Sequence, residues 1–185
     1  MNESSRWLET LNSRRISNLS IVRYPASVLR EKCPAVCGLQ VTAASALASL
    51  AGRMLEIMHG SDGLGLAAPQ VGIPLRMFVW NATGDPADDM SVIDPVLADF
   101  DGKAFGIEGC LSLPGVVANV KRAASATLRG RAPDGSPVDL RDDGLAARIW
   151  QHENDHLDGM LLLNHMCEPE KAFNRAALKA LEDAV

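Results

Sequence analysis

The segment at residues 151–156 reads Gln-His-Glu-Asn-Asp-His and constrains the fold more than any other feature, because it contains the pattern His-Glu-x-x-His. Side chains four residues apart lie on one face of an α-helix, one turn above the other. His152 and His156 can therefore bind one metal ion together, and Glu153 can reach a metal-bound water. Such an ion lowers the pKa of its water towards about 7, and a nearby carboxylate then accepts the proton. The alternative is that the two histidines are ordinary surface or capping residues.

Composition indicates a single globular domain. The chain has 185 residues, of which 47% are hydrophobic and 22% charged, and this length allows a substantial core. A net charge of −5 without a long basic run argues against a nucleic-acid surface. No apolar run approaches the roughly 20 residues of a membrane-spanning helix, and the polar N-terminus lacks the apolar core of a signal peptide. We expect a cytoplasmic protein that binds neither nucleic acid nor membrane, while its oligomeric state stays open.

Apolar spacing predicts an α+β fold. Residues 41–58 repeat apolar side chains every three or four positions, which is typical of a long helix. Short strands are predicted at 77–80, 91–93 and 105–112, and a hairpin joins 126–131 to 138–140 around a Pro-Asp-Gly turn. We expect short antiparallel or mixed strands packed around a central metal-binding helix, with one helix on its N-terminal side and one at the C-terminus.

The ends of the chain carry further expectations. Residues 1–20 are predicted to be a loosely ordered arm, and residues 21–185 a single catalytic domain. The arm has three apolar candidate anchors, which are Trp7, Leu8 and Leu11. A last helix, from about residue 169 to 182, is expected to pack back onto the domain through Phe173, Ala177, Leu178 and Leu181.

The metal-binding helix is predicted from Leu145 to Asp158, closed by a glycine. Leu145, Ile149, His152 and His156 are spaced 4, 3 and 4 residues apart, so they form one stripe. A buried apolar stripe with two satisfied core histidines is the alternative. It does not explain the accompanying glutamate, and it leaves potentially charged groups in a core without partners, which is costly.

A catalytic metal site with an open position needs at least one more protein ligand. Cys110 is the better candidate, because Gly109 beside it lets a metal and a substrate approach the backbone closely. His165 is a weaker candidate, and an inert buried thiol is the alternative for Cys110. A Cys-His-His set suits zinc or ferrous iron.

Three motifs, in this order along the chain, resemble the peptide deformylase family. Gly-x-Gly-Leu-Ala-Ala-x-Gln occurs at 63–70, Glu-Gly-Cys-Leu-Ser at 108–112 and Gln-His-Glu-x-Asp-His at 151–156. The segment at 21–30 also resembles the family's opening segment, so the similarity spans roughly residues 21–166. Three complete motifs in order are a specific signal, and the chain is identified as a member of this family.

The resemblance implies a hydrolase that removes the formyl group from the N-terminal formylmethionine of new polypeptides, such as nascent chains at the ribosome, and releases formate. It implies one divalent metal ion, natively Fe²⁺, with Zn²⁺ or Ni²⁺ able to occupy the site in purified protein. The ligands that it implies are Cys110, His152 and His156. A metal-bound water would attack the formyl carbon.

The resemblance also implies roles for the neighbouring groups. Glu153 would be the general base and then the general acid. Gln70 and the backbone N–H of Leu111 would stabilise the developing oxyanion, a contribution that preorganised donors make in many hydrolases. A polar residue at the end of a loop is the alternative for Gln70. Glu108 and Arg122 would form a structural ion pair.

The substrate would bind beside the metal. The glycine-rich loop would pair with the peptide much as a strand does, and Gly65 and Gly109 would leave room for its backbone. Leu64, Leu145 and Ile149 would form the pocket for the methionine side chain, although plain core is the alternative for the last two. Arg148 and Trp150 flank the helix and are expected to shape the entrance.

One departure from the family affects the substrate. Some relatives have an arginine after the position of Pro114 that holds the peptide backbone, whereas residues 115–119 here contain none. The alternative function is therefore the same chemistry on a formylated specialised metabolite or peptide. A general metallopeptidase, a cysteine nucleophile with a histidine base and a structural metal site are further alternatives.

Overall fold

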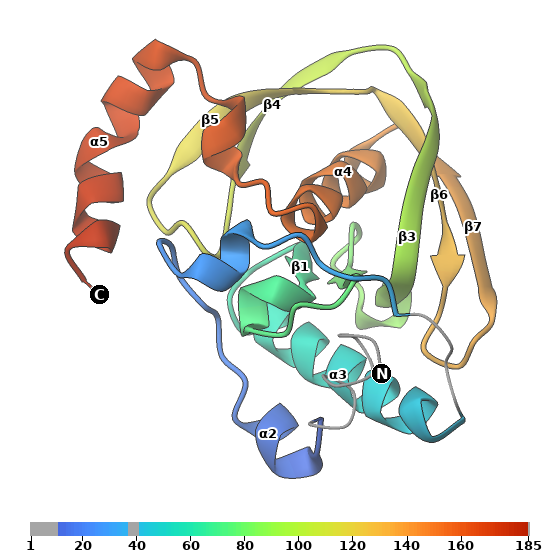
Figure 1. Cartoon of the computed structure of the whole chain (residues 1–185). Coiled ribbons are helices and arrows are strands. Elements are labelled where there is room, and N and C mark those ends of the chain that lie inside the picture. Colours follow the sequence, from blue (N-terminus) through green and yellow to red (C-terminus); the bar gives the residue numbers. More distant parts are fainter. Residues whose placement is uncertain (1–10, 37–40, 185) are drawn as a thin grey trace.

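Helix α4 lies at the centre of the fold, with the strands around it (Figure 1). The computed structural model describes residues 11–36 and 41–184 of the chain. Within them, antiparallel pairing gives a five-stranded sheet in the order β1-β2-β3-β6-β7 and a two-stranded ribbon, β4-β5. The strands are β1 Gly65–Ala67, β2 Met77–Trp80, β3 Met90–Asp101, β4 Ala104–Gly109, β5 Val117–Arg122, β6 Ser125–Arg131 and β7 Pro137–Asp142.

The helices confirm the predicted α+β class. The α-helices are α2 Ser13–Ser17, α3 Val41–His59, α4 Leu145–Leu157 and α5 Glu168–Glu182. Short 3₁₀ turns occur at Ser27–Arg30, Ala68–Val71, Pro86–Asp88 and Leu162–His165. No helix among the described residues is long and apolar enough to cross a bilayer.

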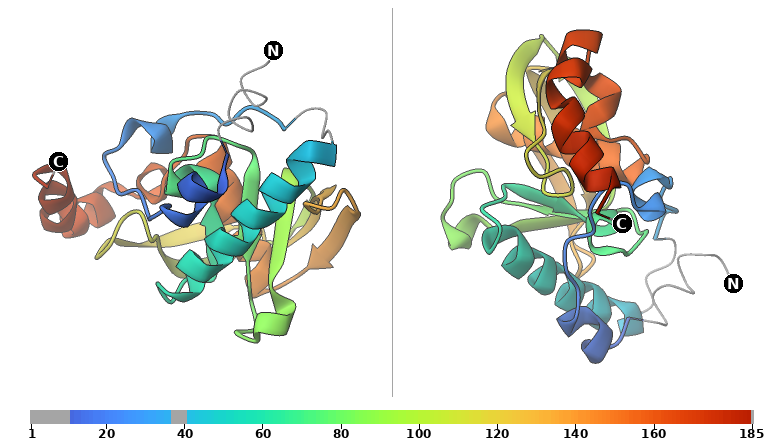
Figure 2. Two further views of the ribbon diagram at one scale, coloured as in Figure 1. Left: turned by 90° about the horizontal axis from the view of Figure 1, so that it is seen from below. Right: turned by 90° about the vertical axis from the view of Figure 1, so that its left-hand side faces the viewer.

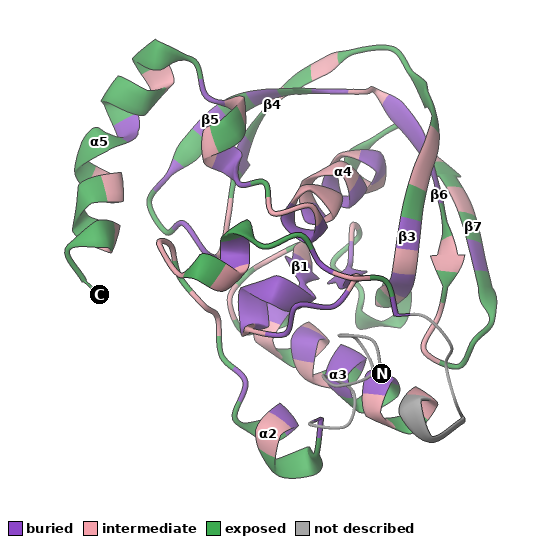
Figure 3. Cartoon of the chain, in the orientation of Figure 1, coloured by how far each residue is buried: buried purple, intermediate pink, exposed green. Residues whose placement is uncertain are grey.

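Strand β2 is buried on both faces, because α3 and α4 pack on opposite sides of it (Figure 2). Met77 and Val79 belong to the core cluster formed with α3. Phe78 and Trp80 alternate with them and belong to the cluster formed with α4. This two-residue alternation places α4 against one face of the sheet, and the central burial is visible in Figure 3.

Trp150 lies in that core and does not shape the entrance. Its ring packs edge-on against Trp80, with the ring centroids 6.0 Å apart, and it is 2% exposed. The reason is helical geometry, since Trp150 follows Ile149 on α4 and points towards the five-stranded sheet. The prediction that Trp150 shapes the entrance was therefore wrong, because it rested only on the position of Trp150 beside the motif.

The N-terminal segment is packed more closely than the predicted arm implies. Trp7 and Leu8 lie outside the described residues. Leu11, Ile16 and Leu19, however, are buried in the core cluster of α3. Helix α2 begins at an Asn12 side chain that accepts a hydrogen bond from the Arg15 N–H at 2.9 Å, as N-cap residues do. Apolar burial thus holds residues 11–20 against α3.

Helix α5 covers the outer edge of β5. The Asn174 side chain accepts a hydrogen bond from the Val117 N–H at 3.2 Å and donates one to the Val117 carbonyl at 2.8 Å. Glu170 accepts a hydrogen bond from the Asn119 N–H at 2.7 Å. Phe173, expected to pack on the domain, is instead 79% exposed. The contacting face of α5 is centred one residue further on, at Asn174.

The predicted strands are partly correct. Residues 77–80 and the hairpin of β6 and β7 lie as expected, whereas the strand predicted at 91–93 is only the start of β3. The strand predicted at 105–112 ends at Gly109, because the chain turns there and the Leu113 N–H donates to the Cys110 carbonyl at 2.9 Å. This turn moves Cys110 out of the ribbon and towards α4.

Replacing Gly159, which lies just after α4, is expected to destabilise the fold. It has φ of +72°, and a Cβ there would lie 2.8 Å from the carbonyl carbon of Arg30. Gly135 has φ of +88° but open space around it. We expect Gly159→Ala to lower the free energy of unfolding by about 2–5 kcal/mol and Gly135→Ala by about 1–2 kcal/mol, because only the first adds a steric collision to left-handed strain.

Urea denaturation of the two variants measures this difference. Equal losses in the two variants would contradict it, because they would show that the backbone at Arg30 moves aside.

Candidate metal centre

Three potential metal ligands converge beside α4. Cys110 comes from the turn after β4, and His152 and His156 from α4. Their ligand atoms all lie within 4.8 Å of one another, and Cys110 Sγ lies 3.3 Å from His156 Nε2. His165 is elsewhere, with its Nε2 2.7 Å from Asp155 Oδ2. The geometry therefore favours Cys110 over His165 as the third ligand.

The surroundings of Cys110 favour its thiolate. Burial would raise the pKa of this thiol, but the charge on His156 and hydrogen bonds with His152 and His156 lower it to about 5. The thiolate is the form of cysteine that binds metals. An inert buried thiol would show the opposite shift, as Cys33 does, where burial raises the pKa to about 12.

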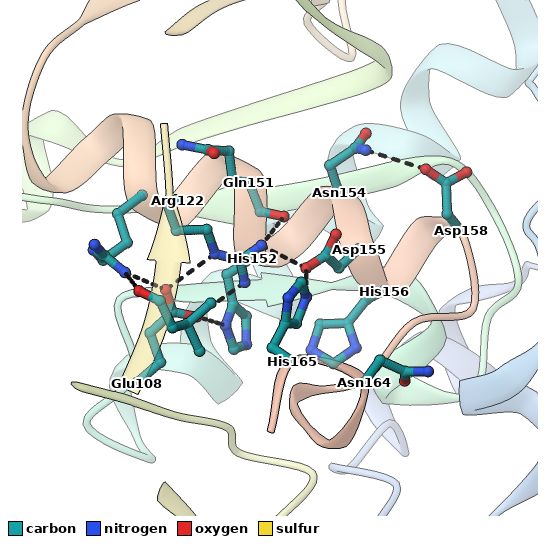
Figure 4. A network of polar contacts seen from close by, with 12 residues as sticks. Glu108, Arg122, Gln151, His152, Asn154, Asp155, His156, Asp158, Asn164 and His165 are labelled. Atoms are coloured by element: carbon teal, nitrogen blue, oxygen red, sulfur yellow. Dashed lines mark hydrogen bonds and ion pairs between the residues drawn. The ribbon is translucent and has the colours of Figure 1, made fainter. Parts of the chain in front are cut away.

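A buried carboxylate orients His152. Glu108 Oε2 lies 2.8 Å from His152 Nδ1 (Figure 4). With Nδ1 engaged, the other ring nitrogen of His152 is the one that can bind a metal. Carboxylate–histidine–metal arrangements of this kind fix the tautomer and the ring orientation of the ligand.

Glu108 is in turn held by arginine. Arg122 donates to Oε1 at 3.1 Å and to Oε2 at 2.9 Å, which gives the expected ion pair. Burial would raise the pKa of Glu108, but hydrogen bonds from His152 and Arg122 and the charge of Arg122 hold it well below its ordinary value. Arg122 also donates to Asp155 at 2.6 Å, and Asp155 pairs with His165, so the network in Figure 4 extends from Glu108 to His165.

Glu153 is a buried carboxyl group with spare hydrogen-bonding capacity. It is 4% exposed, and none of the described residues hydrogen-bonds to its Oε2. Burial raises its pKa to about 7. An unpaired buried carboxyl group is costly, and such a group beside three metal ligands is suited to exchanging a proton with a substrate or water.

Gly65 makes room for Glu153. A Cβ at Gly65 would collide with the Glu153 carboxyl group and lie 2.8 Å from Ile149 Cγ2. The glycine thus lets β1 lie directly against α4. It also keeps the sheet edge and the carboxyl group side by side.

Gln70 is oriented by its own loop. Its Oε1 accepts a hydrogen bond from the Ala67 N–H at 2.8 Å. This leaves Nε2 directed at Cys110 Sγ, 3.5 Å away, and at Ser112 Oγ, 3.3 Å away. Because Gln70 is 1% exposed, it is a fixed amide donor at the site, not a mobile polar residue at a loop end.

A cavity of about 390 Å³ opens beside these groups. Every residue predicted to bind the substrate lines it, together with the catalytic candidates. The predicted residues are Leu64, Gly65, Gly109, Leu145 and Ile149. Leu145 is 47% exposed, so it forms the rim, whereas Ile149 is buried and serves both the core and the cavity wall. Leu111 and Arg148 also line the cavity.

Some residues of the site were not identified from the sequence, and Ile107 and Ser112 are two of them. Ile107 lines the cavity. The sequence signal for it is the alternation of side chains along β4, which places Glu108 on the buried face and Ile107 on the exposed face. Ser112 accepts from Gln70, and its signal was membership of the Glu-Gly-Cys-Leu-Ser motif. Recognising either residue as part of the site requires knowing which residues form β4.

Replacing Glu108 is expected to cost stability in a pH-dependent way. At pH 7, Glu108→Gln should lower the free energy of unfolding by about 3–5 kcal/mol, because it removes one of the two carboxylate charges that neutralise buried Arg122. The folded-state pKa of Glu108 lies below the unfolded value of about 4.3. Its contribution is therefore fully present above about pH 5 and is lost as the pH falls below about 4.

Urea denaturation between pH 3 and 7, with a chelator present, tests this expectation. Glu56→Gln is the control, because Glu56 pairs with Arg53 at the surface and should cost less than about 1 kcal/mol. A wild-type–variant difference that does not shrink at low pH would contradict the stabilisation of the Glu108 carboxylate.

Comparisons with known proteins identify the family. A family model described as polypeptide deformylase matches residues 18–172. A peptide deformylase of Rhodopirellula baltica is 39% identical over 152 residues, which are 81% of this chain and 74% of the relative. One from Thermodesulfovibrio yellowstonii is 34% identical over 87% of this chain and 96% of the relative.

Solved structures show the same likeness. The crystal structure of peptide deformylase from Thermus thermophilus has a TM-score of 0.81 at 35% identity, covering 90% of this chain and 98% of that one. A peptide deformylase from Legionella pneumophila gives 0.82 at 30% identity, covering 90% and 96%. Since the family model and these relatives cover most of the chain, the protein belongs to the peptide deformylase family of hydrolases.

Proposed function

We propose that this deformylase removes the formyl group from N-terminal formylmethionine by means of one divalent metal ion, with Glu153 exchanging the proton. The observation that carries the proposal is the buried, unpartnered carboxyl oxygen of Glu153. Glu153 lines the same cavity as Cys110 and His152, which form a candidate ligand set with His156. A structural metal site would need neither this carboxyl group nor the Gln70 amide beside it.

The residues present fit a metal ion. One thiolate and two imidazoles lie close enough to share an ion, and three protein ligands leave a position open. This donor set suits ferrous iron, zinc or nickel, and we propose Fe²⁺ as the native ion, with Zn²⁺ or Ni²⁺ able to replace it in purified protein. When bound, the ion would supply a Lewis acid and acidify a coordinated water.

Glu153 supplies the proton transfer. Its pKa of about 7 lies near neutral pH, where general bases are most effective. We assign Oε2 to accept the proton of the attacking water. The same oxygen then gives the proton to the peptide nitrogen as the C–N bond of the formamide breaks, which leaves formate and a free amine.

Gln70 and the backbone of Leu111 stabilise the formyl oxygen as it becomes negative. The Gln70 amide is held by Ala67, so its Nε2 needs no reorientation during the reaction. Leu111 follows Cys110 directly and lines the cavity, which brings its N–H to the same region. Such preorganised donors are effective because they do not reorganise as charge develops.

The substrate peptide would lie between two strand edges. Strand β1 is an edge strand of the five-stranded sheet, and β4 pairs with one strand, β5. Residues of both β1 and β4 line the cavity. An extended peptide can therefore pair with them as an added strand. Its methionine side chain would enter between Leu64, Leu145 and Ile149.

Formylated nascent chains at the ribosome are the proposed source of substrate. The expected cytoplasmic location stays a prediction, and a relative from Arabidopsis thaliana, 35% identical, is named chloroplastic/mitochondrial. The stretch after Pro114 still lacks an arginine, and Val117 there is exposed. Formylated small molecules are therefore included in the test.

Glu153→Ala is expected to lower kcat for formate release from formyl-Met-Ala-Ser by about 10²–10⁴-fold, because the general base is lost. The assay uses protein prepared anaerobically with ferrous iron, and Glu56→Ala is the matched control at an exposed glutamate. Equal rates would remove the role of Glu153, and activity that survives chelation would favour a cysteine nucleophile. No release from metal-loaded wild type, with release from a formylated amine, would favour the alternative substrate.

Gln70→Met is expected to lower kcat by about 10²–10³-fold with little change in KM, because the lost donor acts mainly in the transition state. Steady-state kinetics on formyl-Met-Ala-Ser measure both constants. A thermal melting curve of the variant shows whether losing the hydrogen bond from the Ala67 N–H destabilises the fold, so that this effect can be distinguished from the loss of kcat. A raised KM at unchanged kcat would show that Gln70 only binds the ground state.

A further inference from the structure

Arg148 joins the two elements that supply the metal ligands. It lies on α4, one turn before His152, and its side chain reaches the β4-β5 ribbon. Nη1 donates to Glu108 Oε1 at 2.6 Å and to the Val120 carbonyl at 3.1 Å, and Nη2 donates to the Ala104 carbonyl at 2.9 Å. One helical side chain thus binds a carboxylate and the backbones of both strands.

The guanidinium of Arg148 packs against the ribbon at Gly106. A Cβ on Gly106 would lie 3.0 Å from Arg148 Cζ and 3.2 Å from its Nε and Nη2. Gly106 pairs with Val120 across the ribbon, and the Val120 carbonyl is one of the acceptors of Arg148. The absence of a side chain at Gly106 therefore allows the close approach of α4 to the ribbon.

Arg148 and Arg122 hold the Glu108 carboxylate differently. Arg122 spans both oxygens, whereas Arg148 binds only Oε1. The other oxygen, Oε2, is the one that faces His152 Nδ1. Arg148 thus holds the carboxylate on the side away from the imidazole and fixes which oxygen meets His152.

We propose that Arg148 is a positioning residue for the metal site, an inference that rests on the proposed metal-dependent function. It acts through Glu108, two residues before Cys110, and brings the thiolate of the ribbon and the imidazoles of the helix to one point. This role is distinct from the Glu108–Arg122 ion pair, because Arg122 lies on the ribbon, whereas Arg148 reaches from α4 to Glu108 and to the carbonyls of Ala104 and Val120.

The test is the Zn²⁺ dissociation constant of the metal-free protein, measured by chelator competition well below the melting temperature. Arg148→Met keeps the apolar stem and removes the donors, and it should weaken Zn²⁺ binding about 10–100-fold, as loss of outer partners of metal ligands does. Arg148→Lys should recover part of this loss. Arg129→Met is the control, since Arg129 is a half-exposed arginine paired with Asp99 and Asp139, and it should leave the constant unchanged.

A double-mutant cycle distinguishes positioning from general support of the fold. In a Glu108→Gln background, Arg148→Met should change the constant by less than about threefold, because the carboxylate through which Arg148 acts is gone. An unchanged constant in Arg148→Met, or an equal loss in both backgrounds, would overturn the proposal. The absorption spectrum of the Co²⁺ form should shift in Arg148→Met and not in Arg129→Met.

Gly106→Ala is the second variant, in case Arg148→Met does not fold. It retains the guanidinium but displaces it from its position against Gly106. It should therefore weaken Zn²⁺ binding, as Arg148→Met does, and unchanged binding would count against the proposal. These measurements need no substrate. Intact Zn²⁺ binding without formate release would therefore contradict the proposed function and leave the role of Arg148 standing.

Discussion

The proposed metal centre depends on the contacts of the Glu108 carboxylate. This carboxylate is buried between the ribbon and α4, where it accepts hydrogen bonds from Arg122 and Arg148 and contacts His152 Nδ1. A buried charge is tolerated only when its partners satisfy it, and here the partners come from both elements. The same contacts that satisfy Glu108 therefore fix the distance between the strand that leads to Cys110 and the helix that carries the histidines.

The fold supports this junction from the opposite side of α4. The helix packs its aromatic and aliphatic face on β2 and β6, and Gly65 brings β1 against Glu153. The helix is thus held by apolar contacts on one side and by charged contacts on the other. This division explains why the Glu153 carboxyl group can be almost fully buried and still face a cavity, since Gly65, the first residue of β1, lines that cavity.

Much of the site could be predicted from the sequence, because its information is local. The i, i+4 spacing of His152 and His156 specifies a shared face on any helix, and the motif around Cys110 is contiguous. The missed features depend on tertiary pairing. Strand β1 has only three residues. Trp150 points to the core because of where the sheet lies, and Phe173 is exposed because α5 contacts β5 through Asn174.

The side-chain cover on β5 has a consequence for how other chains meet this protein. Unpaired strand edges invite pairing with foreign strands and hence aggregation. Asn174 and Glu170 occupy the backbone groups of Val117 and Asn119, so α5 acts as a built-in blocker on that side of the ribbon. The other edge of the ribbon is that of β4, whose residues line the cavity. In the proposed function, an incoming extended chain would therefore pair with the ribbon on the β4 side, beside the Glu153 carboxyl group.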